Sequence, residues 1–209
     1  MKTTVNLNFR KHSLALCAGA LALVGTTSAF AQAVVYKADQ GSKVKIEGTS
    51  SIHPWDVNSS VIGGMMEVDP KFPDAGTVKP TAQVKIPVRT LKSYQKKMDE
   101  VMQDYMEMAK FPSIEYKLTE LKAKGAAKDG KAEFDAVGDL IIHGTTKSVT
   151  MPVTVEKLED GAKLKVTGKT PIKTTDYGVK AVDVNLGIGH ITTGEDVTIS
   201  FEWLLKKQQ

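Results

Sequence analysis

The feature that most constrains this chain is a series of segments in which apolar and polar residues alternate, separated by turn-forming residues. Four such segments follow one another at 113–122, 131–143, 148–158 and 163–170. Alternation with a period of two is typical of β-strands that bury one face. Asp129-Gly130 and Asp160-Gly161 each separate two of these segments, and Asp-Gly in this position is a strong hairpin signal. The sequence therefore predicts an antiparallel meander.

Further extended segments are expected on both sides of the meander. They are 43–47, 55–68 with a bulge or sharp bend at Gly63-Gly64, 83–88 and 197–201. Residues 69–80 predict a surface loop, and residues 174–195 predict a long loop that contains at most a short strand. About eight strands indicate an all-β domain, which either closes into a barrel or forms a filled sandwich. Periodicity alone does not distinguish these two folds.

One segment, residues 93–110, predicts an amphipathic helix instead of a strand. Its apolar stripe consists of Met98, Val101, Met102, Tyr105 and Ala109. Ser93 is the expected N-cap, and Phe111-Pro112 is expected to end the helix. Methionine side chains adapt to irregular apolar partners. We therefore expect this helix to cap one end of a barrel, where Met98, Met102 and Tyr105 would close the interior.

Residues 1–31 have the three parts of an export signal. Lys2, Arg10 and Lys11 form a basic start, an apolar run follows at 14–24, and Ala29-Phe30-Ala31 offers small residues for cleavage. We expect cleavage after Ala31, with Ala33 as the alternative position. The apolar run is too short to span a membrane comfortably. The expected mature protein is a single domain over residues 32–209, without stable membrane insertion.

Removal of this signal changes the charge and the cysteine content of the protein. The complete chain has a net charge of +4, whereas residues 32–209 hold 25 basic and 24 acidic side chains, a net charge of about +1. This balance gives no electrostatic reason to expect nucleic-acid binding. The only cysteine, Cys17, lies inside the predicted signal. The mature protein is therefore expected to have neither disulfides nor a lipid anchor.

Motifs that carry catalysis or bind metals are weak in this sequence. His53, His143 and His190 are not paired at the short spacing of a zinc site, and there is no Gly-x-Ser-x-Gly motif. Gly187-Ile188-Gly189 begins like a dinucleotide loop, but no βαβ unit follows it. We expect no catalytic residues and no metal site. An enzyme that uses His53, Asp56 and His143 remains an alternative, which requires the three groups to converge in space.

Several motifs along the chain resemble those of the YceI-like family. The longest is GDLIIHGTTKSVTMPV, at 138–153, which is similar to the family's G-x-L-T-I-H-G-V-T-K-x-V-x-L-P-V stretch. The helix and the following KFPSI, the TDYGV at 175–179 and the closing ITTGEDVTISFE at 191–202 match its other landmarks. SIHPWDV at 51–57 resembles the S-x-H-x-W form of one branch. Thr145 and Ser148 depart from the usual residues.

The resemblance implies a lipocalin-like antiparallel barrel that is commonly exported to the periplasm. Known members of this family bind a long apolar molecule, such as a polyisoprenoid or an isoprenoid quinone, along the barrel axis. The leading hypothesis is therefore a non-enzymatic periplasmic protein that sequesters or carries such a lipid, with no other cofactor. The alternative is a stress or interaction module whose barrel is packed solid. The sequence does not distinguish a monomer from a homodimer.

Alternation identifies the residues expected to face the interior, and the helix and the His53 region add further candidates. The candidate ligand-binding set is Ile46, Trp55, Val84, Ile86, Val88, Met98, Met102, Tyr105, Ile114, Tyr116, Phe134, Leu140, Ile142, Val197, Ile199 and Phe201. Val153 and Val166 are also expected to point inward. Alternation does not separate a dry pocket from an ordinary core, so only the family resemblance favours a cavity.

Overall fold

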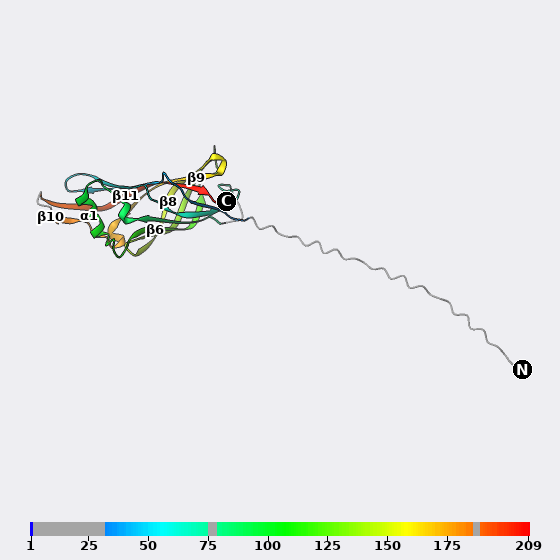
Figure 1. Ribbon diagram of the computed structural model, residues 1–209, viewed down its shortest axis with the longest axis horizontal. Helices are drawn as coiled ribbons and strands as arrows, with labels where there is room; N and C mark the ends of the chain where they lie inside the picture. The colour runs from blue at the N-terminus through cyan, green and yellow to red at the C-terminus, as the bar shows by residue number, and fades with distance from the viewer. Residues whose placement is uncertain (2–31, 75–78, 186–188) are drawn as a thin grey trace. The chain divides into compact units, whose positions relative to one another are not determined.

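The computed structural model describes Met1 and residues 32–74, 79–185 and 189–209 (Figure 1). The export signal predicted for residues 1–31 lies outside these residues, apart from Met1 itself. The described chain from residue 32 onward forms an all-β domain with one α-helix, as the sequence predicted.

Eight antiparallel strands form a closed ring in the order β1-β4-β5-β6-β7-β8-β9-β11, and β11 pairs back onto β1. The barrel prediction is therefore confirmed and the sandwich is excluded. These strands are β1 (Val34–Ala38), β4 (Gly63–Val68), β5 (Thr81–Pro87), β6 (Ser113–Ala123), β7 (Lys131–Ile142), β8 (Thr145–Leu158), β9 (Lys163–Lys173) and β11 (His190–Lys207).

Two more strands extend this ring along its length. β2 (Lys43–Ser50) and β3 (Trp55–Ser59) form a hairpin, and β2 pairs with the same edge of β11 that β1 uses. Tyr36 pairs with Lys207, and Ile46 pairs with Ile199. β1 and β2 therefore lie end to end along β11, as two parts of one interrupted strand of the wall. On their other side β4 pairs with β1 and β3 pairs with β2, so β3 and β4 form a second interrupted strand. Main-chain hydrogen bonds between Asn58 and Lys92 continue the wall beyond β3.

Two of the hairpin turns have the two-residue geometry that their sequences favour. At the β6–β7 turn, Asp129 and Gly130 have φ angles of 51° and 74°, and His143 and Gly144 have the same angles at the β7–β8 turn. Positive φ at two successive residues is the type I′ geometry, which matches the twist of the flanking strands. Asp-Gly is favoured there because glycine adopts positive φ without steric cost.

The helix is shorter than predicted. α1 spans Lys96–Tyr105, not 93–110, and Ala109 is exposed beyond its end. Gln95 occupies the N-cap position without a side-chain cap bond, and Ser93, the expected N-cap, instead donates its backbone N–H and its hydroxyl to Asp99. Tyr94, before the helix, and Glu107, after it, have positive φ angles of 64° and 44°, so helical geometry does not extend through either residue.

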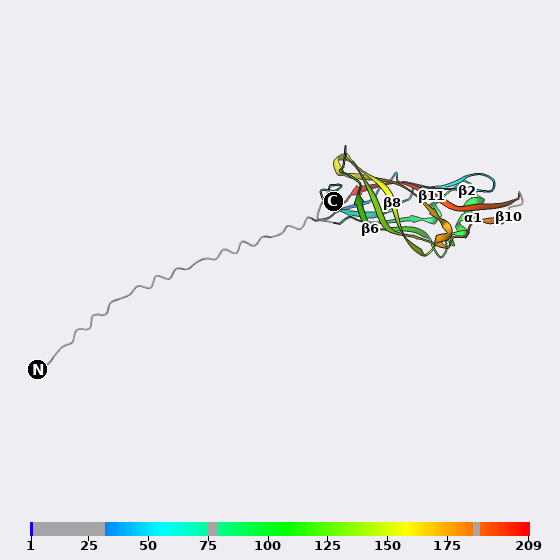
Figure 2. The same ribbon diagram turned by 180° about the vertical axis from the view of Figure 1, so that it is seen from behind.

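The loop predicted over 174–195 contains the short strand that the sequence allowed, and the prediction was wrong in placing residues 190–195 outside the final strand. A short 3₁₀ turn, η3 (Thr174–Tyr177), is followed by β10 (Asp183–Asn185), which pairs with the first residues of β11. β11 begins at His190 and continues to Lys207, well beyond the predicted 197–201. α1 and β10 lie together at one end of the barrel, opposite the C-terminus (Figures 1 and 2). We call this end the helix end.

The opposite end of the barrel is filled by aromatic side chains. The loop after β4 carries Phe72, which is 5% exposed and stacks on Phe134 of β7 with 5.6 Å between ring centroids. Tyr36 of β1 is also buried there and donates its hydroxyl to the Gly161 carbonyl at 2.7 Å. We call this the sealed end.

A short 3₁₀ turn, η1 (Val88–Thr90), links β5 to the segment that precedes α1, and Val88 is fully buried.

Candidate functional site

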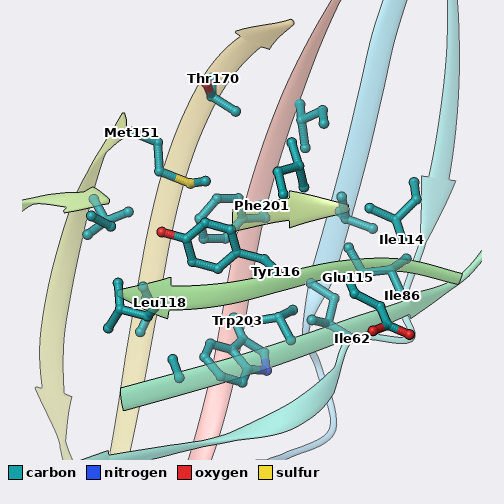
Figure 3. A pocket seen from close by; sticks show the side chains of 18 of the residues that line it. Ile62, Ile86, Ile114, Glu115, Tyr116, Leu118, Met151, Thr170, Phe201 and Trp203 are labelled. Atoms are coloured by element: carbon teal, nitrogen blue, oxygen red, sulfur yellow. The ribbon is translucent and has the colours of Figure 1, made fainter. Parts of the chain in front are cut away.

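The barrel encloses an apolar cavity of about 100 Å³ (Figure 3). Its walls are formed by β2, β4, β5, β6, β7, β8, β9 and β11, together with Ile62 between β3 and β4. Side chains from opposite walls, including Tyr116 of β6 and Phe201 of β11, project into this space (Figure 3). Because the strands alternate, every second residue of each wall is available to face the cavity.

Eight of the sixteen predicted site residues line this cavity, and they come from five strands. They are Ile46, Val84, Ile86, Ile114, Tyr116, Leu140, Ile199 and Phe201. Val153 and Val166, which were also expected to point inward, belong to the same lining. Alternation along these strands therefore located much of the wall, and the role of these residues as ligand contacts stays a prediction.

The other eight predicted residues lie outside the cavity lining, in two groups. Four are buried in the surrounding core: Val88, Phe134, Ile142 and Val197. Four belong to the helix end or the β2–β3 hairpin: Trp55, Met98, Met102 and Tyr105. Met98 and Met102 pack half-buried against the core, whereas Trp55 donates its indole N–H to the Thr49 carbonyl at 2.9 Å.

Several lining residues were not among the predicted site residues. They are Val44, Ile62, Met66, Ala82, Glu115, Leu118, Leu121, Ala136, Met151, Val155, Thr170 and Trp203. The alternation of β11 continues from Phe201 to Trp203, so this pattern was sufficient to find the tryptophan. Leu121 was harder to assign, because the register shifts between Leu118 and Glu120 and moves the inward face by one residue.

Two aromatic rings of the cavity lie directly over glycines on the neighbouring strand. A Cβ placed on Gly138 would lie 2.5 Å from the Tyr116 ring, and a Cβ on Gly168 would lie 2.6 Å from the Phe201 ring. A side chain at either glycine would overlap the aromatic ring, so the missing side chain creates the space that the ring occupies. Large and small residues thus interdigitate across neighbouring strands, as in other small barrels.

Two polar atoms in the cavity wall are buried without a hydrogen-bond partner among the described residues. They are the hydroxyl oxygen of Tyr116 and the indole nitrogen of Trp203. Burial, assisted by the negative charge of Asp139, raises the pKa of Tyr116 to about 12. The phenol therefore stays protonated at neutral pH. Each unpaired group costs free energy, because its hydrogen bond to water is lost on folding without replacement.

The one carboxylic acid among the described lining residues, Glu115, is bound by two side chains that do not belong to the lining. Glu115 accepts a hydrogen bond from Ser113 at 2.9 Å and forms an ion pair with Lys85 at 3.2 Å. These two partners lower the pKa of Glu115 despite its partial desolvation, so it is ionised at neutral pH. No lysine, arginine or histidine is among the residues that line the described cavity. The interior therefore offers hydrogen-bond donors but no positive charge.

One set of contacts holds α1 to the segment before it, and two more tie α1 and the residues after it to the barrel. Asp99, only 8% exposed, accepts both hydrogen bonds from Ser93 and lies 3.5 Å from the Lys92 ammonium. The hydroxyl of Tyr105 bonds to the backbone of Asp183 in β10. Beyond the helix, the Glu107 carboxylate lies 3.1 Å from His143 Nε2 at the β7–β8 turn.

The groups required by the enzyme alternative have separate partners. The His53 ring nitrogen contacts the Pro54 carbonyl at 2.8 Å, Asp56 accepts a hydrogen bond from Asn58, and His143 contacts Glu107. His190 pairs with Asp183 across the β10–β11 hairpin. Within residues 32–74, 79–185 and 189–209, no three His, Cys, Asp or Glu side chains are grouped to hold a metal ion. None of the described helices is long and apolar enough to cross a membrane.

The fold is similar to that of solved structures. A polyisoprenoid binding domain from Saccharophagus degradans, implicated in plant cell wall breakdown, matches with a TM-score of 0.64 at 15% identity, over 85% of this chain and 100% of that domain. Burkholderia cenocepacia BcnA matches with a TM-score of 0.60 at 21% identity, over 78% of this chain and 95% of that one. At these identities the likeness shows a common fold.

The sequence also matches curated relatives and a family model. A UPF0312 protein from Pseudomonas fluorescens strain Pf-5 is 28% identical over 157 residues, which cover 71% of this chain and 77% of the relative. The model of the YceI-like domain matches residues 36–204, which span the barrel from β1 to β11. The chain therefore belongs to the YceI-like family.

Proposed function

We propose that this protein binds a long apolar lipid of the polyisoprenoid class inside its barrel, and that it sequesters or carries the lipid without chemical change. The main observation in support of this proposal is the apolar cavity enclosed by eight strands, with no positively charged residue in its described lining. The polyisoprenoid-binding domain from Saccharophagus degradans, which has the same fold, supports this choice of ligand. A binding role also agrees with the separate partners of His53, Asp56 and His143.

The cavity must widen to take a long chain. Engineered apolar cavities of about 150 Å³ hold a benzene ring, so the 100 Å³ here corresponds to only a short piece of such a lipid. Flexible and aromatic side chains, notably Met151, Tyr116 and Phe201, occupy the rest of the interior (Figure 3). The lipid would enter by displacing these side chains toward the walls, and methionine is well suited to such repacking.

The energetics permit useful affinity without a catalytic or charged group. Burying about 400 Å² of an isoprenoid tail contributes roughly 10 kcal/mol at about 25 cal/mol per Å². Ordering the tail and losing its translation and rotation offset much of this gain. An apolar tube selects for length and girth, so we expect loose specificity among tails of similar shape.

The proposal places the protein in the periplasm, because residues 1–31 have the pattern of an export signal. The mature chain would reach an oxidising compartment without cysteine, since Cys17 is removed with the signal. Cell fractionation tests the proposed export and cleavage. Fractionation of cells that produce the full chain should yield a periplasmic product that begins at Gln32 or Val34, whereas an uncleaved cytoplasmic product would contradict it.

Native mass spectrometry of the mature protein, followed by extraction and identification of bound lipid, tests the binding proposal. We expect a mass above that of the bare chain, with an isoprenoid-type lipid in the extract. Titration of stripped protein with a prenyl hydrocarbon should restore the added mass. A bare mass, an empty extract and no uptake would favour the alternative of a solid-cored interaction module.

A further inference from the structure

The helix end contains most of the sulfur atoms of the expected mature chain. Met98 and Met102 belong to α1, Met106 is its C-cap residue, and Met108 lies in the turn that follows. All four side chains are half-buried and pack against the barrel core. We call these four residues the methionine cluster. Residues 32–209 contain seven methionines and no cysteine, so no thiol competes with the cluster for an oxidant.

The other three methionines differ from the cluster in burial or in position. Met66 and Met151 line the cavity and are only 3% and 5% exposed. Met65 is half-buried on β4, where it pairs with Lys37 of β1, and it does not line the cavity. A reagent dissolved in water therefore reaches the cluster and Met65 in the folded protein. It reaches the two cavity methionines only when the barrel opens.

We propose that the methionine cluster is a reversible oxidation site for hypohalous acids, and that its sulfoxides loosen α1 from the barrel. With hypochlorous acid, a sulfur–oxygen bond forms and the oxygen–chlorine bond breaks. Chloride and a proton leave, and the sulfur gives two electrons to the chlorine. A methionine sulfoxide reductase restores the thioether with two electrons and two protons, and the oxygen leaves as water. The reaction goes beyond the proposed lipid binding and does not require a bound lipid.

Sulfoxides in the cluster weaken the apolar contacts that hold the helix. A sulfoxide oxygen is a polar acceptor, and its burial against the core without a partner is unfavourable, so the side chain turns toward water and leaves its contact. α1 has ten residues, a length at which a helix is marginal in water without tertiary packing. The cluster lies outside the ring of eight strands, so the ring persists when the helix loosens.

Peptide mapping tests whether the cluster is the site of oxidation. Dilute hypochlorite, added to the folded mature protein, should oxidise the cluster at least about tenfold faster than Met66 and Met151. The difference should disappear in denaturant. Tryptic digestion isolates the cluster in one peptide, 98–110, separate from Met151 in 148–157 and from Met65 and Met66 in 46–71. Equal rates for cluster and cavity methionines in the folded protein would overturn the inference.

Hydrogen exchange tests whether oxidation loosens the helix. After oxidation the α1 amides should exchange about tenfold faster, whereas the amides of β7 and β8 should change little. Treatment with methionine sulfoxide reductases of both epimer specificities and a thiol reductant should restore the slow exchange. Oxidation of the cluster without faster exchange of α1 would contradict the inference, and so would faster exchange that extends equally through β7 and β8.

Leucine variants assign the effect to the cluster. Leucine keeps the volume and apolar character of methionine but cannot be oxidised. The combined variant Met98→Leu, Met102→Leu, Met106→Leu and Met108→Leu should show no acceleration of α1 exchange after hypochlorite. Met65→Leu is the matched control, because it removes a half-buried methionine outside the helix end, and it should respond as wild type does. An unchanged acceleration in the combined variant would overturn the inference, whereas lipid binding is measured separately by native mass spectrometry.

Discussion

At the scale of single residues, glycines determine how the aromatic rings of the cavity are placed. Gly168 pairs with Phe201 across β9 and β11, and the Phe201 ring covers it. The ring therefore lies close to the wall and leaves the centre of the barrel partly open. Substitution of this glycine tests whether the arrangement maintains the cavity.

Gly168→Ala should push the Phe201 ring away from the wall and into the cavity. Because the added Cβ would lie 2.6 Å from the ring, we expect a loss of about 1–3 kcal/mol in the free energy of unfolding and weaker lipid uptake. Urea denaturation and lipid titration measure the two effects. Gly125→Ala is the control, because nothing lies within 4 Å of its added Cβ. Undiminished lipid uptake in Gly168→Ala would show that the ring position does not matter.

Two tyrosines should respond in opposite ways to removal of their hydroxyls. In stripped protein, Tyr116→Phe should raise the free energy of unfolding by about 1 kcal/mol, because it removes an unpaired buried hydroxyl. Tyr36→Phe should lower it by about 1 kcal/mol, because its hydroxyl is bonded to the Gly161 carbonyl. Chemical denaturation of the two variants measures both changes. Destabilisation by Tyr116→Phe would mean that its hydroxyl has a partner in the folded protein.

At the scale of elements, local sequence signals determined the strands better than the helix. Alternation and the turns at Asp129-Gly130 and Asp160-Gly161 predicted β6 to β9 within a few residues. The N-terminus of α1 was misplaced because Ser93 bonds to the Asp99 side chain instead of capping the helix, and Tyr94 adopts a positive φ that its residue type does not predict. β1 was missed altogether, since its sequence VVYKA is too short for the pattern to be distinctive.

Asp99 should make the attachment of α1 dependent on pH. Burial alone would raise its pKa, but the hydrogen bonds from Ser93 and the charge of Lys92 outweigh this effect and lower it. Asp99 therefore stabilises the fold above its unfolded pKa of about 3.9, and this contribution is lost as the pH falls through the lower folded pKa. Asp99→Asn should cost about 2 kcal/mol at pH 7.

Hydrogen exchange of the α1 amides and chemical denaturation, measured from pH 7 to pH 3, check this dependence. The difference between wild type and Asp99→Asn should shrink toward the acid end of the range. Asp104→Asn is the control, because Asp104 is exposed on the same helix. A difference that stays constant with pH would show that Asp99 acts through packing and not through its charge.

At the scale of the whole molecule, the strand pattern left barrel and sandwich open, the family resemblance implied the barrel, and neither showed which residues line its interior. Alternation predicted Leu140 and Phe134 equally as inward residues, yet only Leu140 lines the cavity, whereas Phe134 stacks on Phe72 at the sealed end. The distinction depends on position along the barrel axis, which a period of two does not encode. The unpaired state of Trp203 is equally invisible in the sequence, because it depends on what the opposite wall lacks.

The two ends of the barrel differ in how firmly they are closed, and this difference predicts where lipid enters. At the helix end, Met98 and Met102 pack only half-buried against the core, whereas Phe72 at the sealed end is 5% exposed and stacked. Side chains that make fewer contacts are displaced at lower cost. We therefore expect lipid to exchange through the helix end, although the methionines themselves do not line the cavity.

Replacement of both Met98 and Met102 by Ala should speed the loss of bound lipid more than it lowers the stability of the fold. The rate is measured by transfer of a fluorescent prenyl lipid from loaded protein to empty vesicles, and stability by chemical denaturation. Phe72→Leu, which loosens the sealed end but keeps it apolar, is the comparison and should leave the transfer rate near that of wild type. If Phe72→Leu accelerates transfer as much as the methionine pair, the entry route lies at the sealed end, because only there does this variant remove contacts.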